Sequence, residues 1–292
     1  MARLRRRGYD ADMVRWLPIF RQSPPPAAAD DAPPPDPAPV SAAPVRIESW
    51  AATHEGRVRA HNEDGYLVCD REGLWAVADG MGGHEGGEWA SGRIVQALEA
   101  AAAATEGALE PACAAAADAI RAANREILAE AKSRGKQMGS TVVALIVKGN
   151  DYAILWVGDS RAYRLRGGAL AQLSRDHSQV QEMVGRGLMT PEQAVGHPMG
   201  HILSRAVGVQ AEVEVETVTG EVQPGDIFLL CSDGLHGVVG DSEIAAHFSR
   251  EAPGRALDEL VELTLANGAP DNVTGIVVLA SEPTLLSFAD ST

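Results

Sequence analysis

The sequence predicts an α+β fold built on antiparallel sheets, not a doubly wound parallel sheet. Three observations lead to this prediction. Short apolar runs of strand length recur along the chain, bounded by turn residues. The sequences "GND" at 149–151 and "RGG" at 166–168 are hairpin turns that join neighbouring runs. Two alanine-rich helical stretches stand apart from these hairpins and do not alternate with single strands.

The expected elements follow one another from residue 45 onward. Strands are predicted at 46–51, 64–69, 74–78, 140–147, 152–157, 162–166, 169–172, 212–218, 226–231 and 274–279. Long helices are predicted at 88–104 and 109–134, because alanine has the highest helix propensity, and shorter ones at 179–185, 242–247 and 255–266. Residues 174–208 lack strong periodicity and predict an irregular insertion, a kind of segment that often carries function.

The chain divides into four parts by composition. Residues 1–22 form a basic segment, for which a frayed terminus is favoured over a docking peptide. Residues 23–44 contain nine prolines and predict a disordered linker with polyproline II character. A folded domain is expected at 45–281, followed by a tail at 282–292.

The bulk composition excludes several classes of protein. A net charge of −15 is poorly suited to nucleic acid, whose binding depends on Lys and Arg. Three cysteines without a CxxC pair indicate a reducing compartment and no cysteine-based zinc site. No stretch approaches the roughly 20 apolar residues of a transmembrane helix, and no apolar signal core follows the basic start. We therefore expect a cytoplasmic protein, and a monomer.

Acidic residues recur at the ends of the predicted strands. The apolar run at 75–78 ends on an aspartate, and other runs are preceded or followed by acidic residues in the same way. Singly, each is ordinary turn chemistry. If the sheets gather these ends, however, the repulsion between carboxylates requires a counter-ion, and oxygen ligands suit Mg²⁺ or Mn²⁺. The candidate ligands are Glu63, Asp64, Asp79, Asp159, Asp233 and Asp271, with the carbonyl of an adjacent glycine such as Gly80.

Carboxylates that bridge two metal ions are typical of a hydrolase site. Such ions lower the pKa of a bridging water and hold the phosphoryl oxygens of an in-line displacement. Arg59 lies four residues before Glu63, and its planar guanidinium suits phosphate oxygens. A solvated surface arginine is an equally good interpretation of Arg59 from spacing alone. Cys231 lies in an apolar run and is interpreted as a core residue, which argues against a cysteine nucleophile.

Seven motifs together resemble a known family. The segments "VRAHNEDGY", "VADGMGGHEGGEWAS", "GSTVV", "VGDSRAYRL", "LSRDHS", "LCSDGL" and "PDNVTGIVV" occur in the order found in the metal-dependent protein serine/threonine phosphatases of the type 2C class. The "DGMGGH" sequence is similar to the bacterial form. The resemblance covers about 47–279 and implies a four-layer α/β/β/α sandwich. It also implies two Mn²⁺ or Mg²⁺ ions at one end of the sandwich and a weaker third metal site.

The resemblance also implies a role for each candidate ligand. Asp79 matches the bridging carboxylate, Gly80 the residue whose carbonyl is a ligand, and Asp233 and Asp271 the other carboxylates that bind metal directly. Asp64 matches a residue that holds metal-bound water.

Further positions match by the same resemblance. Glu63 would support Asp64, and Asp159 matches a ligand of the third metal, which it shares with Asp233. Arg59 matches the phosphate-binding arginine, and Asn272 a residue near the metal-bound waters. Residues 176–205 match the flap that varies within the family and influences substrate choice.

One position departs from the pattern of animal members. They carry a histidine where Met81 stands, and it is thought to protonate the leaving hydroxyl, which methionine cannot do. His84 could lie near the cleft, although a structural hydrogen bond is the favoured interpretation, and a metal-bound water is another possible acid. The general acid is therefore unassigned. His177, His197 and His201 are interpreted as polar surface or flap contacts, and residues 139–141 as packing and turn residues near the site.

The resemblance and the residues together predict a phosphoprotein phosphatase. A water that bridges two divalent ions would attack phosphoserine or phosphothreonine without a covalent phosphoenzyme. The expected partners are phosphorylated Ser/Thr proteins and a cognate Ser/Thr kinase. One alternative is a non-catalytic pseudophosphatase that only binds phosphoproteins. Another is a nucleotidase, against which the absence of a G-x-x-x-x-G-K-[ST] loop and of G-x-G-x-x-G spacing argues.

Overall fold

The computed structural model describes residues 45–83, 85–104, 107–194 and 196–282. The predicted basic segment, the proline-rich linker and residues 283–292 of the predicted tail lie outside the described residues, so their boundaries stay a prediction.

The described strands form two antiparallel sheets. One sheet has the order β1 (Arg46–His54), β11 (Val273–Ser281), β10 (Ile227–Cys231), β7 (Arg161–Arg166) and β8 (Ala169–Gln172). The other has the order β2 (Asp64–Cys69), β3 (Leu74–Met81), β5 (Val142–Lys148), β6 (Asp151–Val157) and β9 (Glu216–Glu221), and the short β4 (Gly139–Ser140) pairs with the end of β3. The predicted hairpins at 149–151 and 166–168 join β5 to β6 and β7 to β8.

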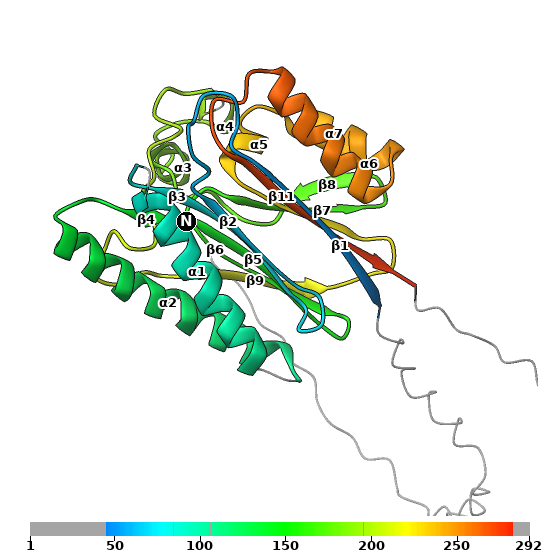
Figure 1. The fold of residues 1–292 in the computed structure, drawn as a ribbon. Coiled ribbons are helices and arrows are strands. Elements are labelled where there is room, and N and C mark those ends of the chain that lie inside the picture. Colours follow the sequence, from blue (N-terminus) through cyan, green and yellow to red (C-terminus); the bar gives the residue numbers. More distant parts are fainter. Residues whose placement is uncertain (1–44, 84, 105–106, 195, 283–292) are drawn as a thin grey trace, which may run out of the picture. The chain divides into compact units, whose positions relative to one another are not determined.

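The two sheets pack face to face, and helices cover both outer faces (Figure 1). α1 (Glu85–Ala104) and α2 (Leu109–Arg134) pack on the sheet of β3 and β5. α6 (Asp241–Arg250) and α7 (Pro253–Ala266) pack on the sheet of β10 and β11. The described part of the chain thus confirms the predicted four-layer α/β/β/α sandwich.

Side chains of one strand serve two different cores. On β3, Trp75 and Val77 point between the sheets, whereas Ala76 and Ala78 face helices α1 and α2. Strands covered on both faces are apolar throughout, which is why β5 reads "VVALIV" without alternation. The alanines of the two long helices allow close packing on this sheet, and Ala90, Ala116 and Ala123 are nearly inaccessible to solvent.

Several strand predictions were wrong in detail, and β1 continues past the predicted end at residue 51 to His54. The strand expected at 212–218 begins only at Glu216. Its cross-strand partner Trp156 lies near the end of β6, and Gly158, with a positive φ, turns the chain just after that strand. Residues 212–215 therefore lie beyond the paired part of β6. The strand expected at 140–147 is divided into β4 and β5, and Thr141 lies between them. The structure also contains two unpredicted short helices, α4 (Pro191–Ala194) and α5 (Asp233–His236), while α3 (Gln179–Gly185) has the predicted bounds.

A buried asparagine fixes the segment that follows the predicted flap. Asn124 of α2 donates hydrogen bonds to the carbonyls of Gln210 (3.0 Å) and Ala211 (3.3 Å). Its side-chain oxygen accepts a hydrogen bond from the Gly208 backbone N–H at 2.7 Å. Gly208 has φ +88°, and a Cβ atom there would meet the Ile127 side chain at 2.2 Å, so both backbone conformation and space require glycine.

We expect Asn124→Ala to destabilise the protein by about 2–3 kcal/mol, because it leaves the Gly208 N–H and two carbonyls without their partner in a buried position. Urea denaturation followed by circular dichroism measures the change. Asp118→Ala on the same helix is the control, since Asp118 is exposed and, among the described residues, pairs only with Arg121. Equal stability of the two variants would contradict the anchoring role of Asn124.

Candidate functional site

The strands bring the predicted carboxylates to one end of the sandwich. Asp64 and Asp79 are direct cross-strand partners on β2 and β3. Asp233 begins α5 just after β10, and Asp271 lies two residues before β11, the neighbour of β10. Asp159 follows the end of β6. Asp79 lies within β3, which continues to Met81, so the sequence placed the end of this strand too early.

These residues converge on a cavity of about 230 Å³. Met81, Thr141, His201 and Leu203 complete much of its wall. The predicted site residues that line it are Arg59, Glu63, Asp79, Gly80, Asp159, Asp233, Asp271 and Asn272. Residues far apart in sequence therefore meet in one place, as in the contact of Arg59 with Asp271, which are 212 positions apart.

Asp64 lies behind this cavity in a poorly solvated position. Its Oδ2 accepts a hydrogen bond from the Ser232 hydroxyl at 2.9 Å, whereas its buried Oδ1 has no hydrogen-bond partner among the described residues. Burial raises the pKa of Asp64 to about 7, and the negative charges of Asp233 and Asp271 act in the same direction. An unpartnered carboxylate oxygen of this kind fits a cation or a cation-bound water.

The other central carboxylates are perturbed in the same sense. Burial raises the pKa of Asp79 well above its usual range, and the charges of Asp64 and Asp233 add to this effect. Burial also raises the pKa of Asp159 to about 7 and that of Asp233 above its usual value. Like charges gathered away from water favour the binding of a divalent cation, which would return these groups to the charged form. The donor set therefore fits Mg²⁺ or Mn²⁺.

Arg59 bridges the rim of the cavity to this cluster. Its guanidinium Nη2 donates to Asp271 Oδ2 at 2.7 Å, although the arginine side chain is 57% exposed. The other Asp271 oxygen accepts the backbone N–H of Asn272 at 2.9 Å. In this arrangement no three Asp, Glu, His or Cys side chains of the described residues are positioned to hold one ion, and a cation would compete with Arg59 for Asp271.

Backbone contacts explain why glycine stands beside Asp79. A Cβ atom on Gly80 would meet the Gly87 carbonyl oxygen at 2.2 Å and the Glu63 carbonyl oxygen at 2.5 Å. The Gly80 N–H donates to that Glu63 carbonyl at 3.2 Å. Glu63 in turn donates its backbone N–H to Asn272 Oδ1 at 2.8 Å. This close packing of three chain segments leaves no space for a side chain at position 80.

Asn272 and Thr141 hold the loops that carry the carboxylates. The Asn272 amide group donates to the carbonyls of Glu55 and His61, each at 2.9 Å. Thr141 Oγ1 accepts the Asp79 backbone N–H at 3.2 Å and lies 2.6 Å from the Ser160 hydroxyl. The predicted packing role of residues 139–141 near the site is confirmed.

His177 and His197 make ordinary hydrogen bonds in the flap segment, as predicted, and His197 Nδ1 accepts the Met199 N–H at 3.2 Å. His84 lies outside the described residues. His177 is a buried flap contact: Nδ1 accepts the Gly158 N–H at 3.0 Å and Nε2 lies 3.0 Å from Glu216 Oε1. His201 lines the cavity. Cys231 is fully buried in the core, as predicted.

The sequence analysis missed His236 as a residue that supports the site. Its Nε2 lies 3.0 Å from the carbonyl oxygen of Asp159, and burial lowers its pKa to about 4, so the ring is neutral and can donate this hydrogen bond. The only available signal was its position in "SDGLHG", three residues after Asp233.

Comparisons with known proteins place the chain among phosphatases. The family model described as Protein phosphatase 2C matches residues 53–269. The serine/threonine protein phosphatase PstP of Mycobacterium tuberculosis is 39% identical over 232 residues, which are 78% of this chain but 44% of that protein. The serine/threonine phosphatase stp of Listeria monocytogenes (strain EGD-e) is also 39% identical, over 77% of this chain and 93% of its own length.

Solved structures show the same fold. PppA, described as a key regulatory component of T6SS in Pseudomonas aeruginosa, superposes with a TM-score of 0.75 at 42% identity and covers 82% of this chain and 99% of its own. The catalytic domain of PstP in complex with two manganese ions superposes with a TM-score of 0.72 at 36% identity, over 81% of this chain and 99% of its own.

We expect the metal-free protein to lose stability as the pH rises from 6.5 to 8. Asp64 and Asp159, with pKa values raised to about 7, bind protons more tightly in the folded protein than in the unfolded chain. Their stabilising contribution is therefore complete at low pH and is lost as the pH passes 7. His177 and His236, whose pKa values are lowered, act in the opposite sense but mainly below pH 6.5.

Thermal denaturation in EDTA at several pH values measures this trend. Asp64→Asn should reduce the slope, whereas Asp258→Asn, at an exposed position of α7, should not. Mn²⁺ should raise the midpoint most at pH 8, where the carboxylates are charged. A midpoint that stays level or rises across this pH range in EDTA would contradict the description of the carboxylates.

Proposed function

Because the chain belongs to the protein phosphatase 2C family, we propose that it is a metal-dependent protein serine/threonine phosphatase. The observation that carries this proposal is the convergence of Asp79, Asp159, Asp233 and Asp271 at one cavity, with Asp64 behind it as the cross-strand partner of Asp79 and with Arg59 at its rim. A protein that only binds phosphorylated residues has no need of so many destabilising carboxylates, and this favours an enzyme over a pseudophosphatase.

We assign the metal ligands from the geometry and the family resemblance together. Asp79, Asp233, Asp271 and the Gly80 carbonyl would hold two Mn²⁺ or Mg²⁺ ions, and Asp159 with Asp233 a weaker third. When bound, the two ions supply an activated water and neutralise charge on the phosphoryl oxygens. The PstP catalytic domain, which has two manganese ions in its structure, supports this assignment.

The residues of the chain then have distinct tasks. Arg59 binds the non-bridging phosphate oxygens, because it already presents an exposed guanidinium at the rim. Asp64 holds the attacking water through Oδ1, the oxygen left without a partner, while Ser232 fixes its other oxygen. Glu63 supports Asp64 from the neighbouring position, and Asn272 holds the backbone of Glu63 in place.

Protonation of the leaving hydroxyl falls to His201 in this proposal. Met81 cannot donate a proton, and His201 is the histidine that lines the cavity among the described residues. His201 also lies close enough to Asp233 for its positive charge to oppose the rise in the pKa of Asp233 that burial causes. A cationic imidazole beside the phosphate would both donate a proton and favour the anionic substrate.

The proposal also covers the substrates, the partner kinase, the location and the oligomeric state of the protein. The substrates are proteins phosphorylated on Ser or Thr, so a Ser/Thr kinase must act before this enzyme, in a signalling pair. None of the helices in the described ranges is both long and apolar enough to cross a bilayer. The free thiols of Cys69, Cys113 and Cys231 agree with a reducing location, and we propose a cytoplasmic monomer.

We expect the purified protein to hydrolyse a phosphothreonine peptide with Mn²⁺ or Mg²⁺ and to be inactive in EDTA. Asp79→Ala should lower kcat at saturating Mn²⁺ by more than tenfold, because it removes the bridging carboxylate. Asp258→Asn serves as the control for a remote carboxylate. Activity of Asp79→Ala above about a tenth of the wild-type rate would refute the metal assignment. Folded protein that binds the peptide without turnover would support the pseudophosphatase.

We expect His201→Asn to slow hydrolysis of a phosphoserine peptide by about 10²-fold or more and that of p-nitrophenyl phosphate only slightly. An alkoxide leaving group requires protonation, whereas p-nitrophenolate is stable without it. Steady-state kcat values on both substrates measure the difference. His197→Asn, also in the flap segment, is the matched control. An equal loss on both substrates would indicate that His201 positions the substrate and donates no proton.

A further inference from the structure

A second and larger cavity, of about 910 Å³, opens beside the catalytic cavity. The two have four wall residues in common: Met81, Gly82, His201 and Leu203. We infer that this second cavity is a groove for the substrate polypeptide next to the phosphorylated residue, and that it selects acidic and apolar flanking residues. This inference rests on the proposed phosphatase function and names its substrate class.

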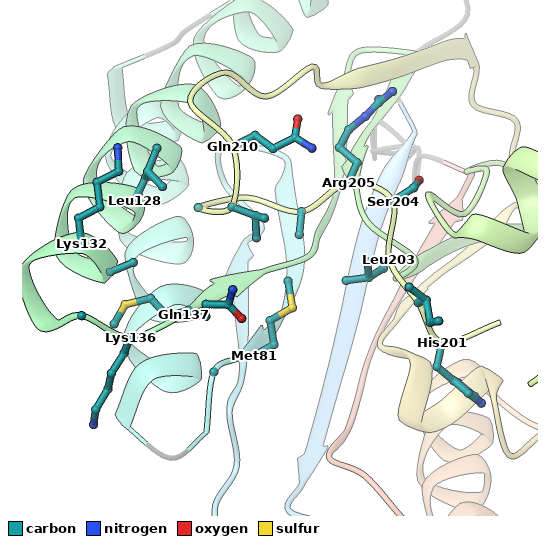
Figure 2. A pocket seen from close by; sticks show the side chains of 18 residues that line it. Met81, Leu128, Lys132, Lys136, Gln137, His201, Leu203, Ser204, Arg205 and Gln210 are labelled. Carbon is teal, nitrogen blue, oxygen red and sulfur yellow. The ribbon is translucent and has the colours of Figure 1, made fainter. Parts of the chain in front are cut away.

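The groove lies between the end of α2 and the segment 201–210 (Figure 2). Leu128, Lys132 and Lys136 come from one side, and His201 to Arg205 from the other. Met81, at the end of β3, lies between these two sides and belongs to both cavities. A phosphorylated side chain in the small cavity would therefore place its own backbone at the mouth of the groove.

The volumes of the two cavities fit different parts of one substrate. The small cavity, at about 230 Å³, is of a size for a phosphorylated side chain. The groove, at about 910 Å³, lies in the range of sites that bind larger organic ligands and can take several peptide residues. The polypeptide on either side of the phosphorylated residue must extend out of the catalytic cavity. Because the two cavities share part of their walls, the groove is a place where it can lie.

The charge of the groove differs from that of the whole protein. The chain has 40 acidic against 25 basic residues, yet the described residues of the groove wall include no Asp or Glu. Lys132 and Lys136, two of the three lysines in the sequence, lie there. Both are exposed, and neither forms an ion pair within the described ranges. Two unpaired ammonium groups at a wall whose described residues include no carboxylate favour an acidic ligand.

Arg205 contributes little to this preference. Its guanidinium pairs with Glu214 at 3.3 Å and with Glu216 at 3.1 Å, so its charge is already compensated. The C-terminal end of α2 carries a partial negative charge, which opposes an acidic ligand. Two carbonyls of the last turn, those of Ala131 and Lys132, already accept the Gly135 N–H. Two full positive charges on Lys132 and Lys136 outweigh this partial charge.

Apolar side chains form the rest of the recognition surface. Ile202 and Val209 are 43% and 54% exposed and belong to the small group of large apolar side chains that are open to solvent. Both line the groove, as do Met81 and Leu128. A flanking segment that combines Asp or Glu with a large apolar residue would neutralise the lysines and cover these side chains.

The test compares kcat/KM for three phosphothreonine peptides whose flanking residues on both sides are Glu, Gln or Lys, each with one Leu near the phosphothreonine. The wild-type enzyme with Mn²⁺ should prefer the Glu peptide to the Gln peptide by about five- to tenfold, as expected for two solvent-accessible charges. The variant K132E/K136E should abolish this preference and favour the Lys peptide. Its rate on p-nitrophenyl phosphate, which does not reach the groove, should stay unchanged.

A matched double variant controls for net charge. R71E/R250E changes the formal charge by the same amount at two exposed arginines, one in the β2–β3 turn at the opposite end of the strands from Asp64 and Asp79, and one on α6. It should keep the wild-type preference. An equal preference in wild type and K132E/K136E, or an equal loss in both double variants, would overturn the groove assignment. Absence of turnover on all substrates, p-nitrophenyl phosphate included, would instead overturn the phosphatase function.

Discussion

The repulsion among carboxylates at one end of the sandwich is the constraint to which the rest of the structure responds. Burial raises the pKa of Asp79, and the negative charges of the nearby Asp64, Asp233, Asp159 and Asp271 raise it further. Such a cluster opposes folding unless a cation is bound or protons are taken up. The remainder of the domain offsets this cost with three apolar cores, one between the sheets and one under each helical layer.

The same cluster is held by contacts that join the two sheets. The Ser232 hydroxyl, at the end of β10, donates to Asp64 on β2 of the other sheet. Asn272, just before β11, accepts the N–H of Glu63, just before β2. The carboxylates therefore cannot move apart without separating the sheets, and the large buried faces of those sheets resist separation. The fold thus gathers at one end of the sandwich the carboxylates that a metal site needs, although in this arrangement no three Asp, Glu, His or Cys side chains of the described residues are positioned to hold one ion.

Much of this arrangement could be predicted from the sequence. The strand ends beside Asp64, Asp233 and Asp271 were predicted because apolar runs and turn residues are local signals, whereas β3 was predicted to end before Asp79 and continues to Met81. The late start of β9 and the break at Thr141 were not predicted, because they depend on where a partner strand ends. The pairing of Arg59 with Asp271 joins residues that only the tertiary fold brings together. The groove could not be predicted either, since Lys132 and Val209 meet only through packing.

The position of Met81 connects the chemistry with the choice of substrate. Its side chain belongs to the walls of both cavities, where animal members of the family carry a histidine. A methionine here cannot deliver a proton, but its flexible, apolar side chain extends the surface of Ile202 and Val209 up to the catalytic cavity. In the proposed mechanism His201, which also lines the catalytic cavity, delivers the proton instead. In these two proposals Met81 recognises the substrate and does not protonate it, which connects the apolar groove with the assignment of the acid to His201.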